Sequence, residues 1–181
     1  MKTAIFLATM LLCAAASGQT PGKVIRDLAD VPPQLRQPNW EAADGMGSCV
    51  NAATITILRY LGLEEQAAWW RENFEGGEWG TSHISHLEES KLLFAYTDTG
   101  DPAFLDWAAR NRLVVGIFYK PRHSINLVNL GMDYAVLLDN NNTGVYEYVP
   151  REEFLRKWAN EYDGFAWTFV YSPPPPWPKS R

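Results

Sequence analysis

Two hydrophobic periodicities divide this chain into a helical first part and a strand-rich second part. Apolar residues at helical spacing predict four helices before residue 113: from Ser48-Cys49 to Leu61, 64–73, from Thr81 or Ser82 to Leu92, and from Asp101 through Ala108. Five later apolar runs predict strands: 113–119, 124–130, 134–138, 145–149 and 165–171. One further helix, 151–160, interrupts them. The order predicts an α+β fold with a mostly antiparallel sheet.

Residues at the predicted helix ends support these assignments. Gly62 follows the first helix and is typical of a residue just past a helix C-terminus. Asp101 followed by Pro102 is typical of an N-cap and a first helical residue. In the second helix, Ala67, Ala68 and Trp70 are expected to face inward. A turn through 131–133 joins two of the strands into a predicted hairpin.

The first residues have the features of a secretory signal peptide. Met1-Lys2 gives a positive start, 4–16 is apolar and rich in small residues, and cleavage is expected between Ala16 and Gln19. A lipoprotein reading would use Cys13 as the anchor, but Leu12 stands where such sites have a small residue. No later apolar run is long enough to span a bilayer. We therefore expect a secreted or periplasmic protein without a membrane span.

The predicted organisation has four parts. They are a signal peptide over 1–18, an extended N-terminal arm over 19–40, one globular domain over 41–172 and a proline-rich tail over 173–181. The formal net charge is −5, and loss of Lys2 with the leader makes the chain more acidic. Acidic charge argues against nucleic acid as a partner. We expect a monomer.

Cys49 is the residue that first suggests chemistry. It is the single cysteine left once the leader is removed, so the mature chain has no internal disulfide. It lies in Gly-Ser-Cys at a predicted helix start, where free backbone N–H groups and the helix dipole stabilise a thiolate. The alternative, a buried structural cysteine, is common among free cysteines. The position at a helix start favours a nucleophile.

A thiol nucleophile needs a base and a group that orients the base. His123 opens a predicted strand, and Asp139-Asn140 ends the next one. A hairpin between the two strands would bring these positions together, so that Asp139 or Asn140 accepts the Nδ1–H of His123.

The same residues resemble the C39-like branch of the papain-like cysteine peptidases. The resemblance covers roughly 40–171 and is carried by motifs in order: Gly47-Ser48-Cys49-Val50-Asn51-Ala52-Ala53, His123 opening a strand, Gly131, Leu138-Asp139-Asn140, and Arg151-Glu152-Glu153-Phe154-Leu155 leading to Trp158. It implies a papain-like fold in which a helical lobe carries the thiol and a sheet lobe carries the base. It also implies a triad of Cys49 as nucleophile, His123 as general base and then acid, and Asp139 as orienter, with Asn140 as the alternative orienter. The implied reaction is acyl transfer through a thioester, with a peptide or protein substrate.

The sequence departs from that family at the oxyanion donor. Papain-like enzymes commonly have a glutamine a few residues before the cysteine, but Ala43 stands six residues before Cys49 and no glutamine lies in 41–48. Gln37 and Asn39 lie further upstream, and a loop that folds back would make either a donor. The missing glutamine motivates an alternative function, a non-catalytic module that binds peptides with tryptophans such as Trp40 or Trp79. A transamidase that uses the same three residues is a third possibility.

His83 and His86 form the remaining candidate site. Their spacing permits a metal pair on one helix face, but no cysteine is near and the neighbouring carboxylates are typical helix charges. We therefore interpret them as a solvated helix face and expect neither a metal nor a cofactor.

Overall fold

The structure is a computed structural model, and it describes residues 30–170. The predicted signal peptide, residues 19–29 of the predicted arm, the end of the last predicted strand and the proline-rich tail lie outside the described residues.

Within residues 30–170, five α-helices and six strands follow one another in the order that the sequence pattern predicts, with one added strand and one short 3₁₀ turn. They are the 3₁₀ turn η1 (Pro33–Leu35), α1 (Cys49–Tyr60), α2 (Glu64–Asn73), α3 (Gly80–Glu89), β1 (Phe94–Thr97), α4 (Pro102–Arg110), β2 (Val115–Phe118), β3 (Ser124–Leu130), β4 (Tyr134–Leu138), β5 (Tyr146–Pro150), α5 (Arg151–Glu161) and β6 (Ala166–Phe169). The strands form one sheet in the order β1-β6-β2-β3-β4-β5, and every neighbouring pair is antiparallel. The predicted α+β fold is confirmed.

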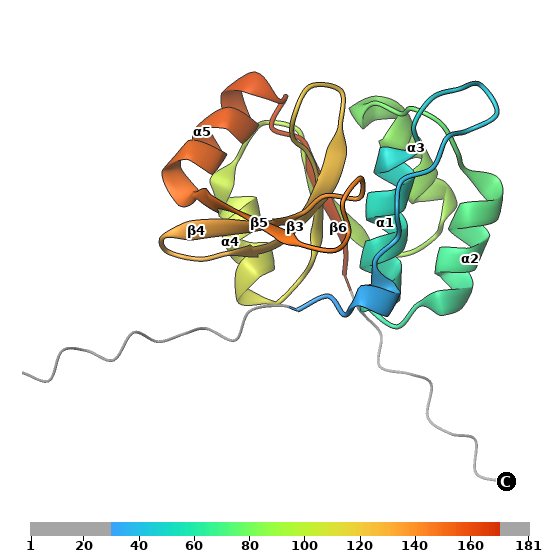
Figure 1. Ribbon diagram of the computed structural model, residues 1–181, viewed down its shortest axis with the longest axis horizontal. Coiled ribbons are helices and arrows are strands. Elements are labelled where there is room, and N and C mark those ends of the chain that lie inside the picture. The colour runs from blue at the N-terminus through green and yellow to red at the C-terminus, as the bar shows by residue number, and fades with distance from the viewer. Residues whose placement is uncertain (1–29, 171–181) are drawn as a thin grey trace, which may run out of the picture.

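The sheet is covered on both faces. Helices α1, α2 and α3 lie on one side of it, and α4 and α5 lie on the other (Figure 1). Successive residues of β3 therefore enter different cores: Ile125 and Leu127 pack with α4 and α5, whereas Val128 packs with α1. Burial on both faces explains why the strand sequences are almost continuously apolar instead of alternating.

Gly116 shows how closely the α1 face is packed. It pairs with Trp167 across β2 and β6, and a Cβ atom at Gly116 would lie 2.3 Å from the Trp167 ring. Trp167 is fully buried and its Nε1 donates to Thr54 on α1. Glycine is therefore required here so that the indole can lie flat against β2 and reach the helix.

The helix ends agree with the sequence predictions in two cases and differ in one. Gly62 follows α1 with a φ of +75°, and the Asp101 side chain accepts from the Ala103 N–H as the N-cap of α4. Helix α3 begins at Gly80 and ends at Glu89, so neither Thr81 nor Ser82 is its N-cap. Ser82 is the third helical residue, and its Oγ bonds back to the Trp79 backbone.

Three further details correct the sequence predictions. Ala68 is exposed, although Ala67 and Trp70 are buried as expected. Strand β1 was not predicted, because it has four residues and forms the sheet edge beside β6. The arm is extended only in part, since η1 lies within it. Within residues 30–170, none of the helices has the length and apolar character that crossing a membrane requires.

Candidate active site

Cys49 is the first residue of α1, and the loop before it closes on itself. The Glu41–Gly47 bridge and a hydrogen bond from Ser48 N to Trp40 O form the neck of this loop. The Ser48 side chain is fully buried and accepts from Gly76 N at 2.8 Å, which fixes the residue before the thiol. From the sheet side, the Ser124 N–H donates to Cys49 Sγ at 3.4 Å. The thiol is therefore held between the helix start and the start of β3.

His123 lies directly before β3 and contacts both of its expected partners. Its Nε2 is 2.8 Å from Asp139 Oδ1, and its imidazole is hydrogen-bonded to the Cys49 thiol. From the sequence, Nδ1 was expected to face the carboxylate, and this detail is wrong. Because Nε2 contacts Asp139, Nδ1 is the nitrogen left for the thiol, so a proton on Nδ1 faces the atoms that would react.

Asp139 has a second charged partner that was not predicted from the sequence. Its Oδ2 accepts from Lys120 Nζ at 2.7 Å, and Lys120 Nζ also donates to Glu147 Oε1 at 2.8 Å. Asp139 Oδ1 accepts from Asn141 N at 2.9 Å in addition to His123. Both carboxylate oxygens are thus held in place. Glu147 lies on β5, and no sequence signal linked this strand to His123.

Asn140, the alternative orienter, does not contact the imidazole. Its buried Nδ2 donates at 2.9 Å to the carbonyl oxygens of both Cys49 and Ser124. One amide group thereby connects the start of α1 to the start of β3. Asn140 therefore holds Cys49 and the start of β3 in a fixed relative position.

Of the two upstream amides, Asn39 lies near the thiol and Gln37 does not. The Gln37 side chain bonds to Arg59 near the far end of α1, which removes it as an oxyanion donor. The Asn39 Nδ2 is 3.2 Å from a Cβ placed on Gly47, and Asn39 lines the same pocket as Cys49. The closed loop of 41–47 explains this, since it projects away and leaves Asn39 beside the thiol despite ten residues of separation.

The charges of the site favour a thiolate–imidazolium pair. Burial acts to raise the pKa of Cys49, but the hydrogen bonds from His123 and from the Ser124 backbone, with the imidazole charge, hold that pKa below its ordinary value. Burial acts to lower the pKa of His123, yet the hydrogen bonds to Asp139 and Cys49 and their charges raise it to about 9. Burial also acts to raise the pKa of Asp139, but His123 and Lys120 hold it well below its usual range.

A pocket of about 550 Å³ opens beside the thiol. It is lined by Asn39, Met46, Gly47, Cys49, Gly77, Glu78, Trp79, Ser82, Phe118, Arg122 and His123. Trp79 is half exposed and its ring lies 4.8 Å from that of Phe118, which gives the pocket an aromatic wall. An adjoining hollow shares these two rings and adds Asp98 and Asp163. Trp40, the other tryptophan considered for binding, is instead covered by Arg71 at 3.8 Å.

The interpretation of His83 and His86 as a solvated helix face is wrong. His83 is fully buried and His86 is partly buried, and both face Glu78, which lies in the loop before α3. The glycine-rich loop of 75–80 folds over the start of α1, so that the face of α3 carrying both histidines is turned inward. The sequence offered the spacing of the two histidines but no sign of this loop's position.

No protein-family model matches this sequence, and no curated protein matches it. A solved structure does match, described as the crystal structure of a double glycine motif protease from an AMS/PCAT transporter in complex with the leader peptide. The identity is 17%, the TM-score is 0.55, and the match covers 82% of this chain and 97% of that one. This chain has a C39-like, papain-like fold. At this identity the likeness shows the fold alone, and the chemistry has to be argued from the residues.

Proposed function

We propose that this protein is a secreted thiol hydrolase that cleaves peptide bonds through a thioester on Cys49. The observation that carries the proposal is the contact chain from the Cys49 thiol through the His123 imidazole to Asp139, set at a helix start and open to a pocket. A thiolate is the nucleophilic form of cysteine, and a hydrogen-bonded imidazole with a lowered thiol pKa favours that form.

The first half of the reaction would form the thioester. Cys49 Sγ attacks the carbonyl carbon of the scissile bond, and the oxygen that becomes negative is stabilised by the Cys49 backbone N–H at the helix start and by Asn39 Nδ2. The C–N bond then breaks, and the His123 imidazolium gives its Nδ1 proton to the leaving amine. The products at this point are the free amine and an acyl group on Cys49.

The second half would release the acid. His123, now neutral, takes a proton from a water molecule whose oxygen attacks the thioester carbon. The C–S bond breaks, and the thiolate–imidazolium pair is restored. Throughout, Asp139 and Lys120 keep the imidazole oriented.

Four observations favour a peptide over a small amide as the substrate. The pocket is large, it has an aromatic wall of Trp79 and Phe118, and a second hollow with two acidic residues adjoins it past the same wall. The matched solved protease is described in complex with a peptide. An extended chain would therefore have one side chain against the aromatic wall and a cationic group near Asp98 and Asp163.

The test is the rate of Cys49 alkylation by iodoacetamide as a function of pH. As pH rises, the wild-type thiol should deprotonate below the ordinary range of about 8.5, because His123 lowers its pKa. In His123→Ala the hydrogen bond and charge of the imidazole are lost, while burial and the Ser124 N–H remain, so the curve should move up toward the ordinary value. Arg122→Ala, which removes a pocket charge not bonded to the thiol, should move the curve much less.

Turnover provides the second part of the test. Cys49→Ala should abolish hydrolysis of a peptide library down to the uncatalysed background, while its circular dichroism and thermal transition stay close to wild type. If the wild-type thiol is alkylated with the pH dependence of an ordinary cysteine, and His123→Ala does not change that dependence, the proposal is refuted and a peptide-binding module is favoured. Amine incorporation into a glutamine-containing protein at the expense of hydrolysis would indicate a transamidase instead.

A further inference from the structure

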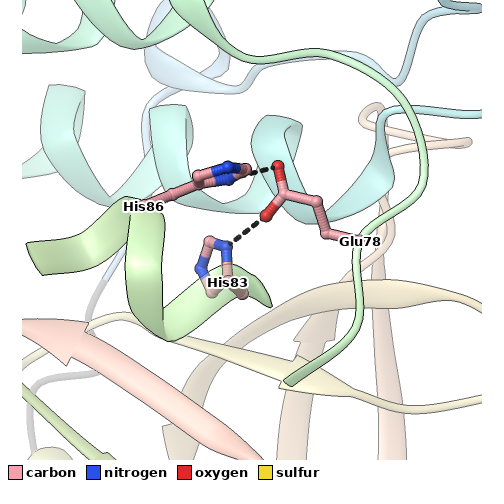
Figure 2. A group of neighbouring side chains, drawn as sticks. All are labelled: Glu78, His83 and His86. Carbon is pink, nitrogen blue, oxygen red and sulfur yellow. Dashed lines mark hydrogen bonds and ion pairs between the residues drawn. The ribbon is translucent and has the colours of Figure 1, made fainter. Parts of the chain in front are cut away.

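A second group of ionisable side chains lies on the helical side of the molecule, apart from the thiol. Glu78, in the loop before α3, faces His83 and His86 on successive turns of that helix (Figure 2). One nitrogen or oxygen atom from each of the three residues lies within 4.8 Å of the others. The proposed hydrolysis uses none of these side chains.

Aromatic rings enclose this group. His83 is fully buried, and the side chains of Glu78 and His86 are 6% and 27% exposed. The Trp167 ring lies 4.4 Å from the His83 ring, and Phe74 stacks on His86 at 4.0 Å. Buried polar atoms in such a shell have to be satisfied by partners within it.

The contacts of Thr54 determine which His83 nitrogen carries a proton. Thr54 Oγ1 donates to Val50 O at 3.0 Å and accepts from Trp167 Nε1, which can only donate. Since the one hydroxyl proton of Thr54 is used on Val50, the 3.3 Å contact between Thr54 Oγ1 and His83 Nε2 requires a proton on Nε2. In the neutral imidazole, Nδ1 is then a lone pair, and it faces the Glu78 Oε2 lone pairs at 2.8 Å.

The other half of the group is unsatisfied as well. Glu78 Oε1 and His86 Nδ1 are 2.9 Å apart, but both atoms are buried and neither has a partner in hydrogen-bond geometry. The His83 Nδ1 lone pair and the Glu78 carboxylate need a positive centre between them, and a cation there would also satisfy His86 Nδ1. A metal cation satisfies all of these atoms at once.

We propose that Glu78, His83 and His86 form a binding site for a divalent metal of the zinc class. Two imidazoles and one carboxylate are a ligand set that Zn²⁺ accepts, and a fourth position remains for water. Ligand atoms at about 2.0–2.2 Å from a metal lie roughly 3.3 Å apart in tetrahedral geometry. The two nitrogen–oxygen distances, 2.8 and 2.9 Å, are a few tenths of an ångström shorter, and all three ligand atoms lie within 4.8 Å of one another. Thr54, which accepts from the far nitrogen of His83, is the outer partner that metal-bound histidines usually have.

A metal at this site would join the loop of 75–79 to α3. Gly77, Glu78 and Trp79 of that loop line the pocket beside Cys49, so the metal would stabilise one wall of the pocket. The site does not depend on Cys49 being a nucleophile, and its test is independent of turnover.

The test measures Zn²⁺ binding in the full chain carrying Cys49→Ala, which removes the competing thiol. In competition with a chromophoric chelator, this protein should bind one Zn²⁺, and its thermal transition should rise with Zn²⁺ concentration. With Co²⁺ it should give the visible absorption of a four-coordinate nitrogen and oxygen site. Adding His86→Gln should weaken binding by more than about 100-fold, beyond the ~10–100-fold effect of losing an outer-shell partner.

Two matched controls separate this site from others. His123→Gln makes the same change at the histidine beside Cys49, and Glu88→Gln removes an exposed charge from α3. Both should keep Zn²⁺ affinity within a few-fold. If the folded Cys49→Ala protein binds no Zn²⁺, or if His86→Gln leaves the affinity unchanged while His123→Gln abolishes it, the proposal is wrong. Should His86→Gln fail to fold, Glu78→Gln, which keeps the shape of the side chain, carries the same expectation.

Discussion

Two histidine–carboxylate pairs in this protein have histidine pKa values that are shifted in opposite directions. His123 contacts Asp139 at 2.8 Å, and His83 contacts Glu78 at 2.8 Å. In the first pair the pKa of the histidine is raised to about 9, whereas in the second it is lowered. The difference lies in the surroundings of each pair.

Burial is the main difference. His83 is fully enclosed by aromatic rings, and this loss of solvent lowers its pKa although Glu78 acts to raise it. His123 keeps some contact with solvent at the pocket, and it gains stabilisation from both Asp139 and the Cys49 thiolate. The lesson is that a histidine–carboxylate distance does not define a role. Access to a pocket and the identity of the third group distinguish the two sites.

The largest expected effect is that of Asp139→Asn. The amide cannot carry the negative charge that stabilises imidazolium, and Lys120 would hold its oxygen and turn its NH₂ toward His123. We expect kcat to fall by about 10⁴-fold, as for the same change in a serine triad. The urea midpoint should also fall, because a carboxylate whose pKa is lowered by folding stabilises the folded state at neutral pH. Single-turnover kinetics would measure the loss of kcat. A loss of less than tenfold would mean that the His123–Asp139 pair is not part of the catalytic machinery.

Asn39→Ala should have the next largest effect. If Asn39 Nδ2 stabilises the developing oxyanion, its loss should lower kcat by about 10²–10³-fold and leave KM nearly unchanged. Gln37→Ala is the matched control, because the Gln37 side chain bonds to Arg59, away from the thiol. Equal effects of the two changes would remove Asn39 from the oxyanion site.

Thr54→Val tests the enclosed pair through stability. Valine keeps the volume but leaves the Trp167 Nε1–H and the His83 Nε2–H without an acceptor. Each unsatisfied buried donor costs about 1–3 kcal/mol, so two of them should lower the free energy of unfolding by about 2–6 kcal/mol in urea titrations. The alkylation rate of Cys49 should stay the same. Thr54→Ser, which keeps the hydroxyl, should recover most of the loss, and a rate effect without a stability effect would contradict the contrast between the two sites.

Lys120→Met should have the smallest effect. Lys120 holds Asp139 Oδ2 and lowers the pKa of Asp139, so its loss should reduce kcat by roughly tenfold, about 1.4 kcal/mol, and move the acid limb of the rate profile to higher pH. Lys157→Met breaks a surface pair with Glu153 of a kind that contributes little, and it should leave the profile in place. If Lys120→Met and Lys157→Met shift the pH–rate profile equally, the shift comes from the overall charge of the protein and not from the contact between Lys120 and Asp139.

The elements of the fold were largely predictable because their signals are local. Helix α2 has the predicted bounds, the Asp101-Pro102 start of α4 is confirmed, and the β3–β4 hairpin follows from two apolar runs and a turn. Strand β1 was missed because a four-residue edge strand has little periodicity of its own. The start of α3 was misplaced because its first residue is a glycine and its N-cap a tryptophan, residues that give no capping signal.

The sequence by itself determined the α+β order, the position of the thiol at a helix start, and the choice of His123 with either Asp139 or Asn140 as its partner; the structure decided between these two. The predicted features depend on periodicity and on hairpin geometry, which act over short distances along the chain. Only the tertiary structure decided that Asn39 and not Gln37 lies beside Cys49, that Lys120 and Glu147 hold Asp139, and that His83 is buried against Glu78. Each of these depends on where a loop or a neighbouring strand comes to rest, and that is set by packing between residues far apart in sequence, which no local pattern records.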